Sequence, residues 1–173
     1  MTKKEVDELR IKAEEAGAAY EKKYRGCAQC TFAALQDALG LRNEYTDAIF
    51  KAASPMAGGG AAEADGHCGA YTGGMLMLGY MHGRERNNFE DPDKTRYRAR
   101  DNASKFHRQF IDEYGSVTCE HIHRKIFGRT FYLRNKNDKD EYIKMGAYED
   151  KCTTVVGRAA GWIIEILAED GYL

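Results

Sequence analysis

The chain has 173 residues, of which 43% are hydrophobic and 31% are charged, a mixture typical of globular rather than disordered proteins. Its 26 lysine and arginine residues nearly balance its 27 aspartate and glutamate residues, so the chain as a whole has no net field to attract nucleic acid or an anionic membrane. This length suits one domain, and we expect residues 1–173 to form it.

Apolar residues at helical spacing run through most of the chain, and no segment alternates for long as a half-buried strand does. The N-terminal pattern predicts an amphipathic helix over about residues 6–24. A second helix is expected over Cys27–Leu39, with Gly40 as its C-terminal stop. Asn43 is expected to cap a third helix that continues through Ala53.

Glycine is concentrated in the middle of the chain, where nine of the 18 glycines fall between Gly58 and Gly83. The first three, Gly58–Gly60, predict a glycine-rich loop, and the later ones lie in a helix that begins near Cys68. Small residues in that helix would let a neighbouring backbone approach closely. If this glycine-rich surface is exposed, it favours a homodimer.

Helices continue in the C-terminal half. We expect a fifth helix over Lys94–Tyr114 and a short sixth from Cys119 to about Ile126. Residues 134–141 are polar and charged and are predicted to be a connection, with at most a brief helical turn after it. The last helix is expected over Asp150–Ala168. The predicted fold is therefore an all-α, single-domain bundle of about six to seven helices, with a glycine-rich loop and a glycine-rich central helix.

Nothing in the sequence predicts a membrane span or a secretory signal. The longest apolar stretch, Cys68–Met81, is interrupted by glycines and is shorter than the ~20 residues that a span requires. The first ten residues are polar and charged. We therefore expect a cytoplasmic protein, in which five cysteines are more typical of metal ligands or redox thiols than of structural disulfides.

Four cysteines share one position in the pattern, because Cys27, Cys68, Cys119 and Cys152 each lie in or beside the first turn of a predicted helix. At least three of them begin an apolar stripe, which points their sulfurs inward. A helix N-terminus carries a partial positive charge, which favours the thiolate. We expect the four to share one site, as candidate catalytic thiols that cycle between dithiol and disulfide or as ligands of iron–sulfur or zinc. The alternative is four buried small residues.

The same residues resemble the C_GCAxxG_C_C family of redox-active proteins over about residues 15–168. Cys68-Gly69-Ala70-Tyr71-Thr72-Gly73 is similar to its central signature, although the order here is Cys-Gly-Ala where the family name has Gly-Cys-Ala. Gly26-Cys27-Ala28-Gln29 resembles its first cysteine segment, residues 114–119 its third, and Cys152 its fourth. The resemblance implies four functional cysteines, a helical fold, a redox role, and relatives in which such a domain holds an iron–sulfur centre. The departures are Cys30 and the long polar connection over residues 129–150.

Cys30 follows Cys27 at the spacing of a CxxC motif, which is common in dithiols and in half metal sites. Residues three apart on a helix lie on one face, so both sulfurs would reach one partner. Cys30 is therefore a candidate for contact with a cofactor. Gly69 and Gly73, in the segment that begins with Cys68, are candidates as well. The alternative for Cys30 is an ordinary core residue.

Two histidines adjoin the cysteines. His67 precedes Cys68, and His123 lies one turn after Cys119 on the same predicted helix face. Either would serve as a metal ligand or as a base for a thiol. The alternative is a hydrogen-bonded structural histidine.

The leading hypothesis is a redox protein that transfers electrons to an unknown partner, through an iron–sulfur cluster or through thiols and disulfides. The runner-up is a non-catalytic, zinc-binding structural or interaction module. A third is an interaction subunit whose cysteines are merely buried. The six basic residues between Lys94 and Arg108 superficially suit nucleic acid, but a solvated helix face explains them in a chain that is not basic overall.

Overall fold

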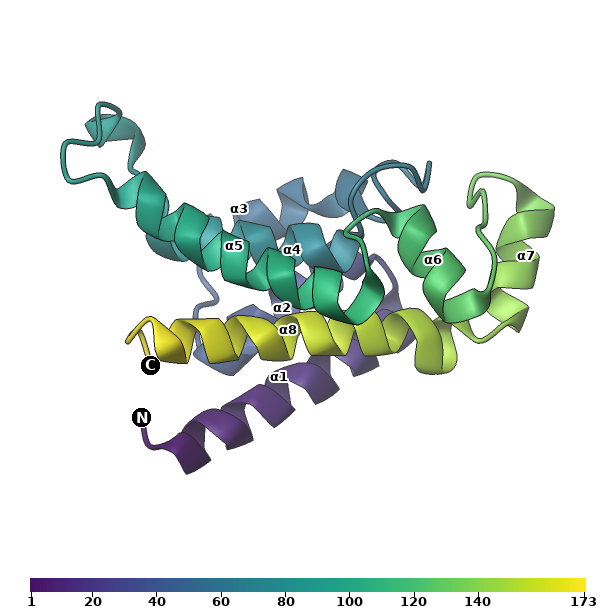
Figure 1. Ribbon diagram of the computed structural model, residues 1–173, viewed down its shortest axis with the longest axis horizontal. Helices are drawn as coiled ribbons and strands as arrows, with labels where there is room; N and C mark the ends of the chain where they lie inside the picture. Colours follow the sequence, from purple (N-terminus) through teal and green to yellow (C-terminus); the bar gives the residue numbers. More distant parts are fainter.

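The computed structural model describes residues 1–173 and confirms an all-α single domain (Figure 1). Its eight α-helices and three short helical segments follow in chain order: α1 Lys3–Tyr24, α2 Cys27–Leu39, α3 Glu44–Ala52, η1 Ser54–Met56, α4 Gly69–His82, η2 Arg86–Asn88, α5 Thr95–Tyr114, α6 Cys119–Phe127, α7 Lys136–Lys144, the π-helical turn η3 Ala147–Lys151, and α8 Cys152–Glu169. None of the helices combines the length and the apolar character needed to span a bilayer.

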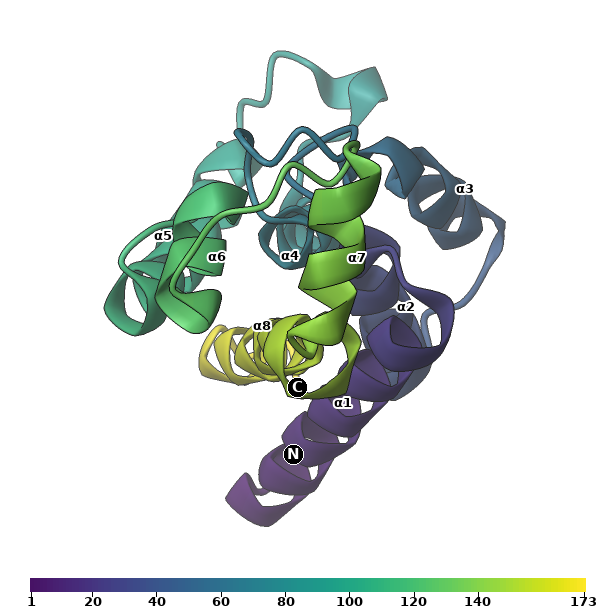
Figure 2. The ribbon, with the colours of Figure 1, turned by 90° about the vertical axis from the view of Figure 1, so that its right-hand side faces the viewer.

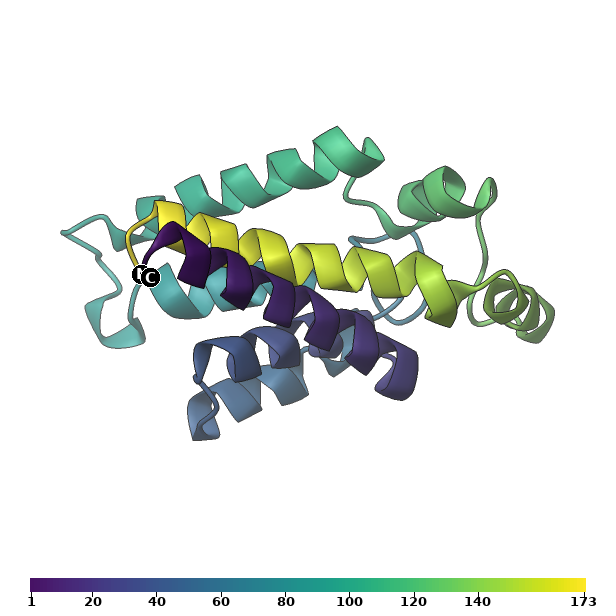
Figure 3. The ribbon, with the colours of Figure 1, turned by 90° about the horizontal axis from the view of Figure 1, so that it is seen from below.

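Helix α8 is the central element of the bundle and packs against α1, α2, α4 and α5. Seen from below, α1 runs alongside α8 (Figure 3). Glycines let the two backbones meet, because a Cβ on Gly157 would lie 2.7 Å from the carbonyl oxygen of Glu14. Ile163, Ile164 and Leu167 of α8 are fully buried in the main core. The apolar side chains of α8 therefore lie at the centre of the main core, between the helices that pack around it.

Three of the four glycines of α4 face inward. Gly69 and Gly73 pack against α2, and Gly74 packs against Phe106 and Ile163, whereas Gly79 is exposed. A homodimer formed through α4 would need an exposed glycine surface, and most of that surface is covered within this chain. In this chain the inward-facing glycines bring α4 close to α2.

Helix α7 corrects the prediction of a polar connection over residues 134–141. Only Tyr142 of this helix is buried, so it has no apolar stripe that periodicity would detect. Its N-terminus is fixed by Asn135, whose side chain accepts hydrogen bonds from the backbone N–H groups of Asn137 (2.9 Å) and Asp138 (3.1 Å). The helix count is thus eight rather than six to seven.

The segment after α6 has a small core of its own. Phe131, Tyr142 and Ala147 form this second cluster, which is separate from the main core. Figure 2 looks along α8 from this end and shows α7 in front of the bundle. Both chain termini lie at the opposite end of the long axis (Figures 1 and 3). The region between the two cores is where the candidate site lies.

Candidate functional site

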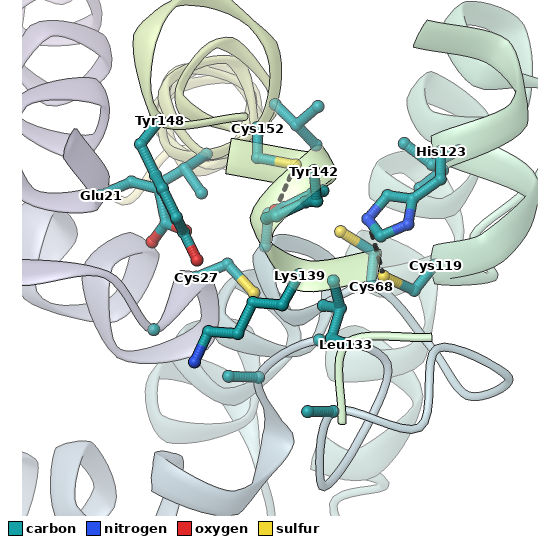
Figure 4. Close-up of a pocket in the computed structure, with 18 residues that line it drawn as sticks. Glu21, Cys27, Cys68, Cys119, His123, Leu133, Lys139, Tyr142, Tyr148 and Cys152 are labelled. Atoms are coloured by element: carbon teal, nitrogen blue, oxygen red, sulfur yellow. Dashed lines mark hydrogen bonds between the residues drawn. The ribbon is translucent and has the colours of Figure 1, made fainter. Parts of the chain in front are cut away.

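A cavity of about 160 Å³ lies between the main core and the second cluster. Most of its lining is hydrophobic, and it receives residues from α1, α2, α4, α6, α7 and α8. Four cysteines line it: Cys27, Cys68, Cys119 and Cys152 (Figure 4). An apolar cavity of similar volume in another protein holds a molecule the size of benzene. The four helix starts therefore bring their thiols to one small, largely apolar space.

A short β-bridge positions two of these cysteines. The backbone N–H of Cys68 donates to the carbonyl of Val117 (2.8 Å), and the N–H of Cys119 donates to the carbonyl of Gly66 (2.9 Å). His67 and Thr118 are the bridged pair between them. The entry to α4 is thereby tied to the entry to α6, so their first-turn sulfurs reach the same cavity.

Cys27 is positioned by two glycines. Gly26, with φ of +90°, turns the chain into α2, where Cys27 is the first residue. Gly69 lies directly against the Cys27 thiol, because a Cβ at that position would overlap Sγ. The sulfur of Cys27 is thus held beside the residue that follows Cys68.

Gly69 and Gly73, predicted as cofactor contacts, do not line the cavity. A Cβ on Gly73 would overlap the carbonyl oxygen of Ala28. In the structure these glycines provide the close packing of α4 on α2.

Cys30, also a predicted cofactor contact, does not line the cavity either. It is 4% exposed, and its thiol donates to the carbonyl oxygen of Arg25 (3.2 Å). The two sulfurs of the CxxC motif therefore lie in different surroundings, one at the cavity and one in the core.

Cys152 begins α8 directly after the π-helical turn. The hydroxyl of Tyr142 donates to its sulfur at 3.0 Å (Figure 4). This hydrogen bond joins α7 to the start of α8 at the cavity wall.

The two predicted histidines differ in placement. His123 lines the cavity, and its Nε2 lies 3.5 Å from the sulfur of Cys119, as the shared helix face predicts. Its Nδ1 is buried without a hydrogen-bond partner, and burial lowers its pKa to about 4. His67 is exposed, contacts Tyr71 edge-on, and does not line the cavity.

Burial governs the protonation of the thiols. It raises the pKa of Cys27 and of Cys119 well above the usual range. It raises the pKa of Cys68 to about 11, although hydrogen bonds from the backbone of Ala70 and Tyr71 at the start of α4 act in the opposite direction. At these helix starts, burial therefore disfavours the thiolates more strongly than the backbone hydrogen bonds favour them.

All five cysteines are free thiols. The cavity cysteines are soft donors of the kind that zinc and iron–sulfur clusters use. However, no three cysteine, histidine, aspartate or glutamate side chains are grouped so that they could hold one metal ion. The donors suit such a group in chemistry, but their present positions do not fit it.

Glu21 is a cavity residue that sequence reasoning missed. It lies near the end of α1, is only 3% exposed, and has a buried Oε2 with no hydrogen-bond partner. Burial raises its pKa to about 7, although the neighbouring Cys30 thiol and the charge of Arg25 lower it in part. The available signal was its position, four residues after Gly17 and eight after Ala13 on the inward face.

Comparison with known proteins gives one match. The family model described as "Putative redox-active protein (C_GCAxxG_C_C)" matches residues 26–166, which include all five cysteines. No curated protein and no solved structure matches the chain.

Proposed function

Because the chain belongs to the C_GCAxxG_C_C family, whose description is that of redox-active proteins, we propose that it transfers electrons through the cysteines of the central cavity. The observation that carries this proposal is the convergence of Cys27, Cys68, Cys119 and Cys152, which come from four separate helix starts. Buried cysteines with a merely structural role have no need to line one cavity. The proposed redox groups are these four sulfurs, with His123 as a polar neighbour of Cys119.

In the thiol form of the proposal, two cavity thiols become a disulfide and release two electrons and two protons. Cys27 and Cys68 are the favoured pair, because the Cys27 sulfur lies against Gly69, the residue that follows Cys68. Cys27 and Cys152 are partly exposed whereas Cys68 and Cys119 are buried, so within the favoured pair Cys27 is the thiol that an oxidant meets first. The electron partner is therefore expected to approach from the Cys27 side.

An iron–sulfur centre is the other form of the proposal. Such a cluster, held by cysteine thiolates, would supply one-electron chemistry. The side chains would first have to move closer together to hold such a cluster.

A zinc-binding structural module is a second candidate function. It is favoured by the place of the cavity between the main core and the small cluster of Phe131, Tyr142 and Ala147. An ion bound there would hold α7 to the bundle and would be redox-silent.

These candidates are separated by analysis of protein purified without oxygen. Iron, zinc and sulfide are measured with a visible spectrum, and free thiols are titrated before and after oxidation. Cys68→Ala removes a cavity thiol, and Cys30→Ala removes one outside the cavity as the control. A reversible loss of two thiols that is absent in C68A, or of four thiols that falls to two in C68A, supports the thiol form when C30A keeps the wild-type loss. Iron with sulfide that C68A loses supports the cluster form.

Two results would contradict electron transfer. Zinc alone, with a large fall in melting temperature on chelation and no change on oxidation, would establish the structural module instead. A metal-free protein whose thiols do not oxidise, and whose variants behave as the wild type does, would leave the cysteines as core residues.

A further inference from the structure

The cavity contains one buried carboxyl among its thiols, and that carboxyl is Glu21. An ionisable side chain is rarely buried without a partner, because desolvation of the charge is costly. Cys30 lies beside the carboxyl, but its thiol donates to the carbonyl oxygen of Arg25, and Oε2 of Glu21 has no partner. An apolar residue at this position would continue the stripe of Ala13 and Gly17. Packing therefore does not account for a carboxyl here.

The chemistry of the cavity thiols gives a reason for a buried carboxyl at this position. A thiol must lose its proton before its sulfur becomes a nucleophile, and burial makes the thiolates of this cavity scarce. Among the charged groups, the Glu21 carboxylate has the largest effect on Cys27, and it raises the pKa of that thiol. A carboxyl that has taken up the proton is neutral and no longer opposes the thiolate. Figure 4 shows the Glu21 side chain and the Cys27 sulfur on the same side of the cavity.

We propose that Glu21 is the proton acceptor of the cysteine site, taking the proton of Cys27 when that thiol is oxidised and returning it on reduction. This inference rests on the proposed function in its thiol form. It assigns a residue outside the four-cysteine pattern to the redox site.

The reaction balances with a small external disulfide as the oxidant. The Cys27 proton passes to the Glu21 carboxylate, and the sulfur attacks the external disulfide, forming a mixed disulfide. The departing half takes the proton from Glu21 and leaves as a thiol. The Cys68 sulfur then attacks the Cys27 sulfur and displaces the second half, which leaves with the Cys68 proton. Two protein thiols are oxidised, and one external disulfide is reduced to two thiols.

Few neighbours of Glu21 change charge near neutral pH. Burial raises the pKa of the nearby cysteines and of Tyr148, and lysine and arginine ordinarily stay charged over this range. Burial raises the pKa of Glu21 itself to about 7. The titratable and charged groups around it are Arg25 at the end of α1, Cys27 and Cys30 of α2, Cys68 before α4, Lys139 and Tyr142 of α7, Tyr148 of the π-helical turn, Cys152 of α8, and Cys119 and His123 of α6, which line the same cavity. A transition near pH 7 would therefore report Glu21.

The test follows the oxidation rate of the reduced full-length protein against pH, with 2-hydroxyethyl disulfide as an uncharged probe. In the wild type, we expect the rate to rise to a plateau with a midpoint near pH 7. Glu21→Gln keeps the shape but cannot accept the proton, so at pH 8 we expect a rate about 100-fold lower and no midpoint near pH 7. Glu21→Asp keeps a carboxyl and should retain a pH transition at a reduced rate.

Glu149→Gln is the matched control, since Glu149 is an exposed carboxylate next to Tyr148 that pairs with Lys22. This variant should behave as the wild type does. An infrared band of a protonated carboxyl that titrates near pH 7 and is missing only in E21Q would support the assignment without reference to rates. A wild-type profile in E21Q would overturn the role of Glu21 alone. A wild type that does not react at all would overturn the thiol form of the proposed function as well.

Discussion

The hydroxyl of Tyr142 donates a 3.0 Å hydrogen bond to the sulfur of Cys152. This contact joins α7, which carries no apolar stripe, to the first residue of the central helix. It also lowers the pKa of Cys152 in part, against the larger effect of burial, which raises it. Through Tyr142, the second cluster is thus hydrogen-bonded to one of the cavity thiols.

Tyr142→Phe tests this contact. Loss of the hydrogen bond should reduce the free energy of unfolding by roughly 1 kcal/mol in urea titrations. It should also slow alkylation of Cys152, because the thiolate loses a donor. Tyr148→Phe is the control, since it removes a hydroxyl from the neighbouring ring, 5.6 Å from Tyr142 between centroids. Equal effects of the two changes would count against the contact.

The packing of α4 on α2 is tested by a pair of glycines in one helix. Gly69→Ala would place a methyl group on the Cys27 sulfur, and we expect a loss of about 1–3 kcal/mol of stability. Gly79→Ala meets nothing within 4 Å and should raise stability by about 0.5–1 kcal/mol, because alanine favours a helix. Melting temperatures compare the two, and a G69A protein as stable as G79A would refute the close approach.

His123 should make the protein sensitive to acid. Burial lowers its pKa from 6.5 to about 4, so between these values the unfolded chain binds a proton that the folded chain does not. Stability is therefore present above pH 6.5 and is lost as the pH falls toward 4, by roughly 3 kcal/mol. His123→Phe keeps an aromatic ring and should flatten this acid limb in chemical denaturation at several pH values. An unchanged limb would contradict burial of a neutral imidazole.

Glu21 should act in the opposite direction. Burial raises its pKa from 4.5 to about 7, so the folded state holds a proton that the unfolded state has already released. The associated stability is present below pH 4.5 and is lost as the pH rises through 7. Glu21→Gln should match the wild type near pH 4 and exceed its stability at pH 8 by roughly 3 kcal/mol. A variant that is less stable than the wild type at pH 8 would show that the ionised carboxylate has a partner.

The helices with apolar stripes were predictable because periodicity records which side of a helix is buried. Phe106, Phe110 and Tyr114 of α5 are buried as their spacing predicts. Helix α7 lacks this signal, because only Tyr142 of this helix is buried. The helix is supported instead by the Asn135 cap and by the ion pair of Lys136 with Asp140. A cap or a single ion pair gives a much weaker pattern in the sequence than an apolar stripe does, so this helix could not be predicted.

The site was predictable in its residues but not in its assembly. Helix phase indicated that Cys119 and His123 share a face, and their 3.5 Å separation agrees. Periodicity could not show that the four cysteines meet, since the bridge at His67 and Thr118 uses backbone groups that any residue carries. Nor did it identify Glu21, because a single charged residue in an amphipathic helix is ordinarily read as solvated.

The chain begins and ends at the end of the bundle opposite the cavity (Figures 1 and 3). An affinity tag or a surface anchor attached to either terminus would therefore leave the cysteine end facing outward. On an electrode or a sensor chip, such a tether would orient every molecule with its thiols toward the solution. Attachment through a surface lysine such as Lys139, which lines the cavity, would instead turn that end toward the support.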